Sequence, residues 1–273
     1  MSDQQRDERR DGAAYFGREV RFAREHKGLT QQQLADEARY ERPYVTRVES
    51  GKLLGSGQFA DACDRVFETS GFFVRLRERV SERGHPGWFI PYVKLEEEAK
   101  EICDYSNALI MGMLQTPAYA EATFRAANPR EDDEQIQARV DARRHRRGAM
   151  ERGKPPLLWV ILHESVLRTV VGSRAVMVEQ LEHLIAEAST PHITVQVLPF
   201  SAGAPASSLP FILLTSGDGT RVLYSETRES GHVNDSAAVV ENAQATYDRL
   251  RAASTSPEES LSLIRNIAEE HAR

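Results

Sequence analysis

The sequence predicts a chain of the α+β class with two domains, the first entirely helical and the second mixed α/β. The chain has 273 residues, and because domains commonly contain about 100–200 residues, two domains account for this length. Apolar residues follow a helical pattern, with short breaks, from Tyr15 to about Arg83. After Lys154 the pattern changes to short apolar runs typical of strands. Residues 84–91 (GHPGWFIP) are rich in proline and glycine and mark the boundary.

The composition is that of a globular protein and excludes several other classes. Hydrophobic residues make up 40% and charged residues 28% of the chain, enough to bury a core. The two cysteines, Cys63 and Cys103, form no CxxC pair, which excludes a disulfide framework and a cysteine-rich zinc site. No apolar run is long enough to cross a bilayer, and the first residues lack the apolar core of a secretory signal. We therefore expect a cytoplasmic protein without a metal or another cofactor.

Charge is distributed unevenly along the chain. The formal net charge is −6, but residues 1–87 carry a slight excess of Lys and Arg whereas residues 88–273 are acidic. An acidic protein is a poor nonspecific DNA binder, although a locally positive docking face is compatible with specific binding. Charge therefore permits nucleic-acid binding without predicting it.

The domain limits follow from the breaks in these patterns. Residues 1–13 are polar and lack periodicity, so we expect a mobile tail. We assign residues 14–83 to the helical domain, 84–91 to the linker and 92–273 to the second domain.

The second domain is predicted to open with helices. One is predicted over Leu95–Leu109, and another starts at Thr116–Pro117, where threonine is the N-cap and proline the first helical residue. Residues 131–150 form a polar helix that is basic at its end. The last helix begins at Ser256 with a capping box.

A short sheet of about four strands is predicted between these helices. Asp218–Gly219 is a hairpin signal that joins the last two strands. The four predicted strands are Leu157–Leu162, Ile193–Leu198, Phe211–Leu214 and Val222–Tyr224.

The sharpest local pattern is a pair of short helices within residues 29–52. Thr30 is a helix N-cap, and Gln33 completes a capping box with it. After a break of three residues, a second helix directs Val45 and Val48 toward the core and leaves a polar outer face. Two such helices, joined by a tight turn, have the shape that a DNA major groove accepts.

A longer motif, T-Q-x-x-L-A…V-x-R-V-E-x-G-K, runs through both helices and is carried by Thr30, Gln31, Leu34, Ala35, Val45, Arg47, Val48, Glu49, Gly51 and Lys52. With this motif, residues 15–83 resemble the Xre/Cro family of helix-turn-helix repressors. The resemblance implies a five-helix domain whose third helix, from about Arg42 to Ser50, enters the major groove. It also implies that a pair formed by Arg24 and Glu49 joins the first helix to the third.

Eight residues are the candidate DNA contacts. Arginine forms bidentate hydrogen bonds with guanine, so Arg42 and Arg47 are the candidate base-reading residues. Tyr44 and Thr46 are suited to a phosphate or a thymine methyl group. In the alternative interpretation, the pair is a generic helical hairpin and these side chains are solvated. The full set is Gln31, Arg39, Arg42, Pro43, Tyr44, Thr46, Arg47 and Lys52.

Two of these candidates rest on the family pattern. Gln31 stands where the family grips a phosphate through a helix N-terminus. Arg39 stands where the family usually has glycine, so either the turn is distorted or Arg39 itself reaches the DNA backbone.

The second domain adds another resemblance, which depends on its motifs as a set. With these motifs the domain is similar to the C-terminal domain of WhiJ-type regulators of actinobacteria. The resemblance implies a developmental or antibiotic-linked transcription factor whose C-terminal domain senses a ligand or a small acidic partner protein. The motifs are MGMLQTPAYA (111–120), LLWVILHESVLRTVVGSRAVMVEQLEHLI (157–185), ITVQVLPFSAG (193–203), PFILL (210–214), VLYSE (222–226) and SPEESLSLI (256–264).

We therefore expect a homodimeric, sequence-specific regulator of transcription, by default a repressor, that binds double-stranded DNA at a pseudopalindromic operator. One alternative is an antitoxin-like protein whose main role is to bind a small partner, with DNA binding for autoregulation. Another is a hydrolase fused to a DNA anchor, because His163 and Glu226 lie at strand ends. The chain has no HExxH, GxSxG, Walker or GxGxxG motif, so we expect no enzyme and no catalytic residues.

Overall fold

The computed structural model describes residues 12–82, 89–151, 153–228 and 230–273. Contacts divide the chain into two compact units. The first comprises Met1–His85 together with Glu131–Lys154, and the second comprises Pro86–Arg130 together with Pro155–Arg273. Residues 131–154 thus pack with the N-terminal helices, although they lie far inside the predicted second domain.

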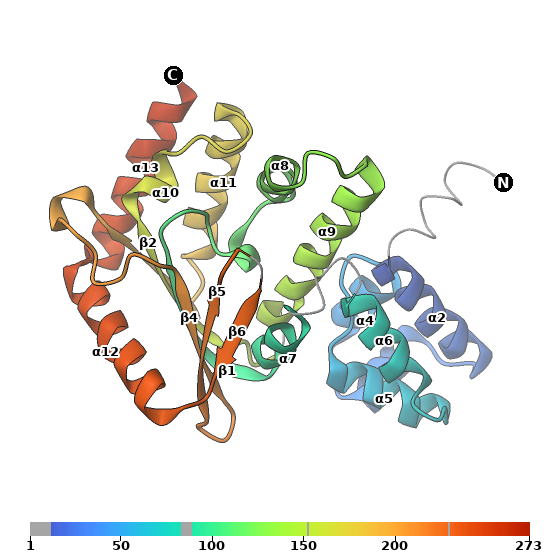
Figure 1. Cartoon of the computed structure of the whole chain (residues 1–273). Coiled ribbons are helices and arrows are strands. Elements are labelled where there is room, and N and C mark those ends of the chain that lie inside the picture. The colour runs from blue at the N-terminus through green and yellow to red at the C-terminus, as the bar shows by residue number, and fades with distance from the viewer. Residues whose placement is uncertain (1–11, 83–88, 152, 229) are drawn as a thin grey trace. The chain divides into compact units, whose positions relative to one another are not determined.

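Within the described part of residues 14–83, the predicted five-helix arrangement is confirmed, and these helices form the larger part of the first unit (Figure 1). Its core consists of side chains that are almost completely buried, among them Phe16, Leu34, Val45, Val48 and Phe59. The five helices are α2 (Gly12–His26), α3 (Gln31–Ala38), α4 (Arg42–Glu49), α5 (Gly57–Phe67) and α6 (Phe72–Glu82); the later segment adds α9 (Asp133–Arg146) and η3 (Arg147–Glu151).

The ends of the predicted first domain fall partly outside the described residues. Of the predicted tail 1–13, residues 1–11 are not described, and Gly12 and Ala13 already belong to α2. Of the predicted linker 84–91, residues 84–88 are not described, and α7 (Ile90–Glu98) begins before its end.

A six-stranded sheet forms the centre of the second unit, in the order β3-β2-β1-β4-β5-β6. Strands β1, β2 and β3 are parallel to their neighbours in that group, whereas β4, β5 and β6 pair antiparallel. The strands are β1 (Ala99–Ser106), β2 (Leu157–His163), β3 (Ile193–Leu198), β4 (Phe211–Ser216), β5 (Arg221–Glu226) and β6 (Gly231–Asn234).

The mixed α/β class is confirmed, but the expected count of about four strands is too low. All four predicted strands are present, and β4 and β5 form the hairpin that Asp218–Gly219 predicts. The helix predicted over Leu95–Leu109 is wrong beyond Glu98, because Ala99–Ser106 is the strand β1 at the centre of the sheet. This strand is buried on both faces and carries the polar Asp104, so it lacks the period-2 pattern of a half-exposed strand.

Helices cover both faces of this sheet (Figure 1). On one face, Tyr247 and Leu250 of α12 (Ala237–Ala253) pack with Cys103 and Tyr105 of β1. On the other face, α7 packs against β1 and β4. The remaining helices of the unit are α8 (Pro117–Ala127), α10 (Glu164–Arg168), α11 (Arg174–Glu187) and α13 (Pro257–Ala272), with 3-10 turns η2 (Gly112–Leu114) and η4 (Phe200–Ala202).

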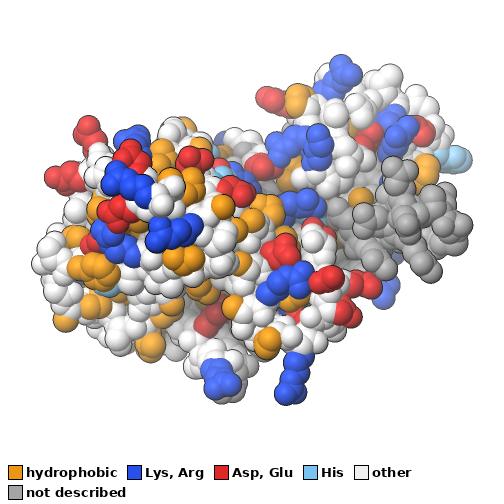
Figure 2. All heavy atoms as spheres, turned by 90° about the horizontal axis from the view of Figure 1, so that it is seen from above, with side chains coloured by type: hydrophobic (Ala, Val, Ile, Leu, Met, Phe, Trp, Pro, Cys, Tyr) orange, Lys and Arg blue, Asp and Glu red, His pale blue; other side chains and the backbone are white. Residues whose placement is uncertain are grey.

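Charged side chains are mixed on the surface. On the face drawn in Figure 2, Lys and Arg side chains lie among Asp and Glu side chains rather than in one basic patch. Within the part of the chain that the structure describes, we find no helix with the length and apolar character of a membrane span.

Candidate nucleic-acid interface

The capping box predicted at the start of α3 is present. The side chain of Thr30 accepts a hydrogen bond from the backbone N–H of Gln33 (3.2 Å), and the side chain of Gln33 accepts one from the backbone N–H of Thr30 (2.8 Å). These bonds satisfy two N–H groups that a helix start otherwise leaves unpaired. They fix where α3 begins, and so the orientation of the turn that follows it.

The turn between α3 and α4 keeps its geometry without glycine. Arg39 adopts the left-handed conformation (φ 63°, ψ 43°) that closes α3, and its backbone N–H donates to the carbonyl groups of Ala35 and Asp36. This conformation costs a residue with a β-carbon about 1 kcal/mol in free energy, whereas glycine adopts it without this steric cost. Arg39 thus occupies the glycine position of the family pattern in the left-handed conformation, and its side chain is exposed.

A buried ion pair holds α4 against α2, as the family resemblance implied. The guanidinium of Arg24 donates from Nε to one carboxylate oxygen of Glu49 (2.5 Å) and from Nη2 to the other (3.0 Å). Only 10% of the Arg24 side chain and 3% of the Glu49 side chain are exposed. The hydrogen bond to Glu49 raises the pKa of Arg24 above its ordinary value. Arg24 also donates to the carbonyl of Leu29 (2.8 Å), so one side chain fixes α2, α4 and the approach to α3.

The close approach of these helices requires glycine at one position. A β-carbon on Gly17 of α2 would lie 2.1 Å from the carbonyl oxygen of Val48 in α4, much closer than van der Waals contact allows. Gly17 therefore lets α4 approach α2 closely enough for Arg24 and Glu49 to pair.

Gln31 is engaged inside the protein rather than standing free. Its amide nitrogen donates to Glu49 (2.8 Å), and its amide oxygen accepts a hydrogen bond from the hydroxyl of Thr46 (3.1 Å). The side chain thereby ties the start of α3 to the middle of α4. Thr46 also donates to the carbonyl of Arg42 (3.1 Å) and remains exposed.

Tyr44 turns inward, unlike the other candidates on α4. Its ring stacks on Tyr40 at 4.5 Å between centroids and meets Phe59 edge-on at 5.3 Å. Its hydroxyl accepts a hydrogen bond from the backbone N–H of Ser56 (2.8 Å), and burial raises its pKa. The expectation that Tyr44 is available for a DNA contact on the outer face of α4 is therefore wrong, because its ring packs against the domain core.

The remaining candidates form the outward face of the α3–α4 pair. Arg39, Arg42, Pro43, Thr46 and Lys52 are exposed. Among the residues that the structure describes, no acidic side chain forms an ion pair with Arg39, Arg42 or Lys52. A helix with such a face offers cationic donors to phosphates and to the acceptor atoms of guanine.

Arg47 is the exception on this face. Its side chain is 41% exposed, and its guanidinium forms an ion pair with Glu151 of η3. This partner could not be predicted from the sequence, because Glu151 lies about a hundred positions later in the chain and no local pattern connects the two residues.

Among the buried carboxyl groups of the second unit, those of Glu96 and Asp104 were not identified from the sequence. Glu96 of α7 accepts a hydrogen bond from the hydroxyl of Tyr92 (2.5 Å), and Asp104 of β1 accepts one from Ser106 (2.7 Å). Burial, with a smaller contribution from the charge of Glu96, raises the pKa of Asp104 to about 7, although the hydrogen bond from Ser106 acts in the opposite direction. His163, which lies at the end of β2, caps α10 by accepting a hydrogen bond from the backbone N–H of Ser165. Among the described residues, no group of three or more His, Cys, Asp or Glu side chains is placed to hold a metal ion.

Two family models match the chain. A model described as a helix-turn-helix domain matches residues 16–72, and a model described as a domain of unknown function (DUF5753) matches residues 89–266. No curated protein and no solved structure matches the chain. Because the second model covers well over half of the sequence, the chain belongs to the DUF5753 family and carries a helix-turn-helix domain ahead of that region.

Proposed function

We propose that the protein is a sequence-specific DNA-binding regulator of transcription, by default a repressor, in which α4 enters the major groove. The observation that carries this proposal is the rigid presentation of α4. The buried pair of Arg24 and Glu49 fixes its inner side, and its outer side carries Arg42, Thr46 and Arg47. Arginines on a helix that is already fixed in place can bind guanine without the entropic cost of ordering the backbone of that helix.

The exposed residues divide into two roles in this proposal. Arg42 and Arg47 read base edges, whereas Arg39 and Lys52 contact phosphates and set the register of the protein on the duplex. Gln31 supports α4 through Glu49 and Thr46, so its contribution to binding is to hold the reading helix in place.

The proposal assigns to the second unit the control of DNA binding, through self-association or through a bound effector or partner protein. A single helix-turn-helix reads a short stretch of groove, so a homodimer on two half-sites supplies the missing specificity. Light scattering of the purified protein with a bound duplex should give two chains per duplex. A ratio of one chain per duplex would show that the protein does not bind DNA as a homodimer.

The test of DNA binding starts from a random-sequence duplex library, from which the purified full chain enriches its preferred sequence. In a mobility-shift assay, Arg47→Ala should reduce the preference for the enriched duplex over a scrambled one by about 5- to 150-fold, since one bidentate arginine–guanine pair contributes roughly 1–3 kcal/mol.

The control is Arg65→Ala, which removes one exposed arginine from α5 and should leave that preference unchanged. If no duplex is enriched, the proposed function is wrong. If enrichment succeeds and Arg47→Ala keeps the full preference, Arg47 does not read bases.

A further inference from the structure

Residues 131–154 belong to the first unit and pack beside the reading helix. Helix α9 packs against α6 and buries Ile136 and Val140, and η3 buries Ala149 and Met150. A β-carbon on Gly148 would lie 3.0 Å from the side chain of Leu53. The segment is therefore seated on the DNA-binding unit by apolar contacts, close to the loop that follows α4.

This packing brings one acidic side chain onto the outward face. Glu151, at the end of η3, forms an ion pair with Arg47, and only 26% of its side chain is exposed. Arg147 lies 3.9 Å from the other carboxylate oxygen of Glu151. Glu49, the acidic residue of α4 itself, is already neutralised by Arg24. Glu151 is therefore the carboxylate that competes for Arg47.

This ion pair conflicts with the role of Arg47 in DNA recognition. A guanidinium engaged with a carboxylate does not have the same donors available for the O6 and N7 acceptors of guanine. For Arg47 to read a base, the pair with Glu151 has to open.

We propose that Glu151 is an autoinhibitory residue, and that residues 131–154 form a regulatory segment that withholds Arg47 from DNA. This inference rests on the proposed function and adds a means of control to it. Both ends of the segment continue into the second unit, and Glu151 precedes the strand β2 by only a few residues. A ligand or partner that shifts the start of β2 would thus act directly on the partner of Arg47. The apparent affinity for DNA then scales with the fraction of molecules in which Arg47 is released.

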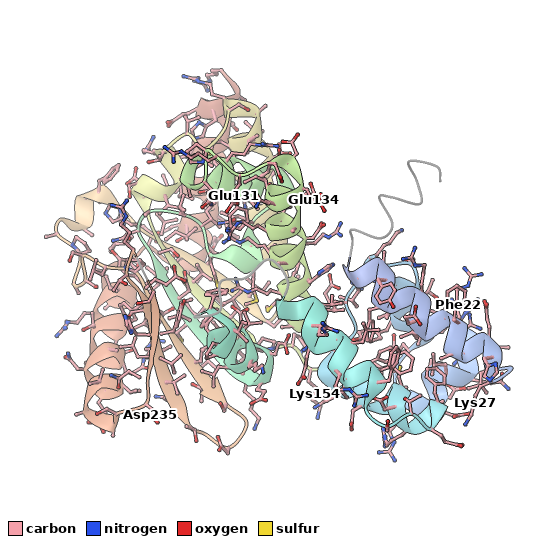
Figure 3. The ribbon with its side chains drawn as sticks, turned by 45° about the vertical axis from the view of Figure 1, so that its right-hand side comes forward. Phe22, Lys27, Glu131, Glu134, Lys154 and Asp235 are labelled. Atoms are coloured by element: carbon pink, nitrogen blue, oxygen red, sulfur yellow. The ribbon has the colours of Figure 1, made fainter. Side chains whose placement is uncertain are left out.

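The chain offers a matched control for this ion pair. Glu131 precedes α9, pairs with Arg139 at 2.6 Å and 2.8 Å, and has a side chain that is 22% exposed. It therefore resembles Glu151 in residue type, partner type and exposure. Figure 3 labels Glu131 and Glu134, which lie at the end of α9 remote from η3.

The experiment compares the full-length wild type, Glu151→Gln, Glu151→Ala and Glu131→Gln by fluorescence anisotropy on the enriched duplex. Both Glu151 variants should bind about two- to fivefold more tightly, the range expected for one partly exposed ion pair. Glu131→Gln should bind as the wild type does. Equal melting temperatures of the four proteins confirm that the comparison reports binding rather than folding.

A second arm tests whether Glu151 acts through Arg47. On the enriched duplex, Glu151→Gln should strengthen binding in the wild-type background and leave it unchanged in an Arg47→Ala background. If the gain persists without Arg47, Glu151 acts only through its charge and the inference is overturned. If the wild type binds its enriched duplex and the Glu151 variants bind equally or more weakly, the inference also fails, while the proposed function stands. If the wild type enriches no duplex, the proposed function itself fails.

Discussion

Replacing Arg24 with methionine tests the idea that a buried ion pair positions the reading helix. The change removes both hydrogen bonds to Glu49 and the bond to the Leu29 carbonyl, and it leaves the Glu49 carboxylate buried with Gln31 as its remaining donor. Removing one member of a buried pair costs about 3–5 kcal/mol, mainly because the other charge stays buried without its partner. A domain is stable by only roughly 5–15 kcal/mol, so the first unit should lose a large share of its stability.

Hydrogen exchange measured by mass spectrometry is the suitable assay, because it separates the two units of one chain. Amides of α2 and α4 should exchange faster in Arg24→Met by a factor corresponding to about 3–5 kcal/mol, whereas amides of β1 and β2 should not change. The double variant Arg24→Met/Glu49→Leu, which removes both charges, should recover most of the protection. The matched control is Arg21→Met, which breaks only an exposed ion pair with Glu25 and should have little effect. Full protection in Arg24→Met, or a double variant no better than the single one, would refute the reasoning.

Two further predictions concern the buried carboxyl group and the turn. The folded protein holds the pKa of Asp104 near 7, above the value of about 3.9 in an unfolded chain, so the folded state binds the proton more tightly and wild-type stability should fall as the pH rises from about 4 to about 7. Asp104→Asn cannot ionise, so its free energy of unfolding relative to the wild type should rise by up to about 4 kcal/mol between pH 4 and pH 8, as measured by urea denaturation. If the difference in free energy of unfolding between the two proteins does not change with pH, the raised pKa of Asp104 is contradicted. Arg39→Gly relieves the left-handed strain and should raise the free energy of unfolding by about 0.5–1 kcal/mol in the same assay. The same variant should weaken DNA binding and lower its salt dependence if Arg39 contacts phosphate, whereas unchanged binding would assign Arg39 to the turn alone.

Local features of this fold could be predicted from the sequence, because their causes lie within a few residues. The capping boxes at Thr30 and Ser256 and the hairpin at Asp218–Gly219 each depend on neighbours in the chain, and all are present. The strand β1 could not be predicted, because a strand buried on both faces can carry a polar residue such as Asp104 without showing alternation.

The candidate interface was predictable to the extent that its residues share one helix. The outward face of α4 follows from helical periodicity, and exposure confirms it for Arg42 and Thr46. Tyr44 was misplaced because its partners, Tyr40 and Ser56, belong to segments whose packing is set by the tertiary fold. The ion pair between Arg47 and Glu151 could not be predicted from the sequence for the same reason, since it depends on where residues 131–154 pack.

The composition of the first unit also limits how the gene can be cut and recombined. A fragment that ends at residue 85 would leave behind α9 and η3, and with them the side chains of Ile136, Val140 and Met150 that pack within the first unit. The DUF5753 match, conversely, includes residues 131–154, which fold with the other half of the chain. Grafting this family region onto a different DNA-binding domain would therefore expose the apolar side of α9 that packs against α6. A chimera should keep residues 131–154 together with residues 12–82, which form one unit with them.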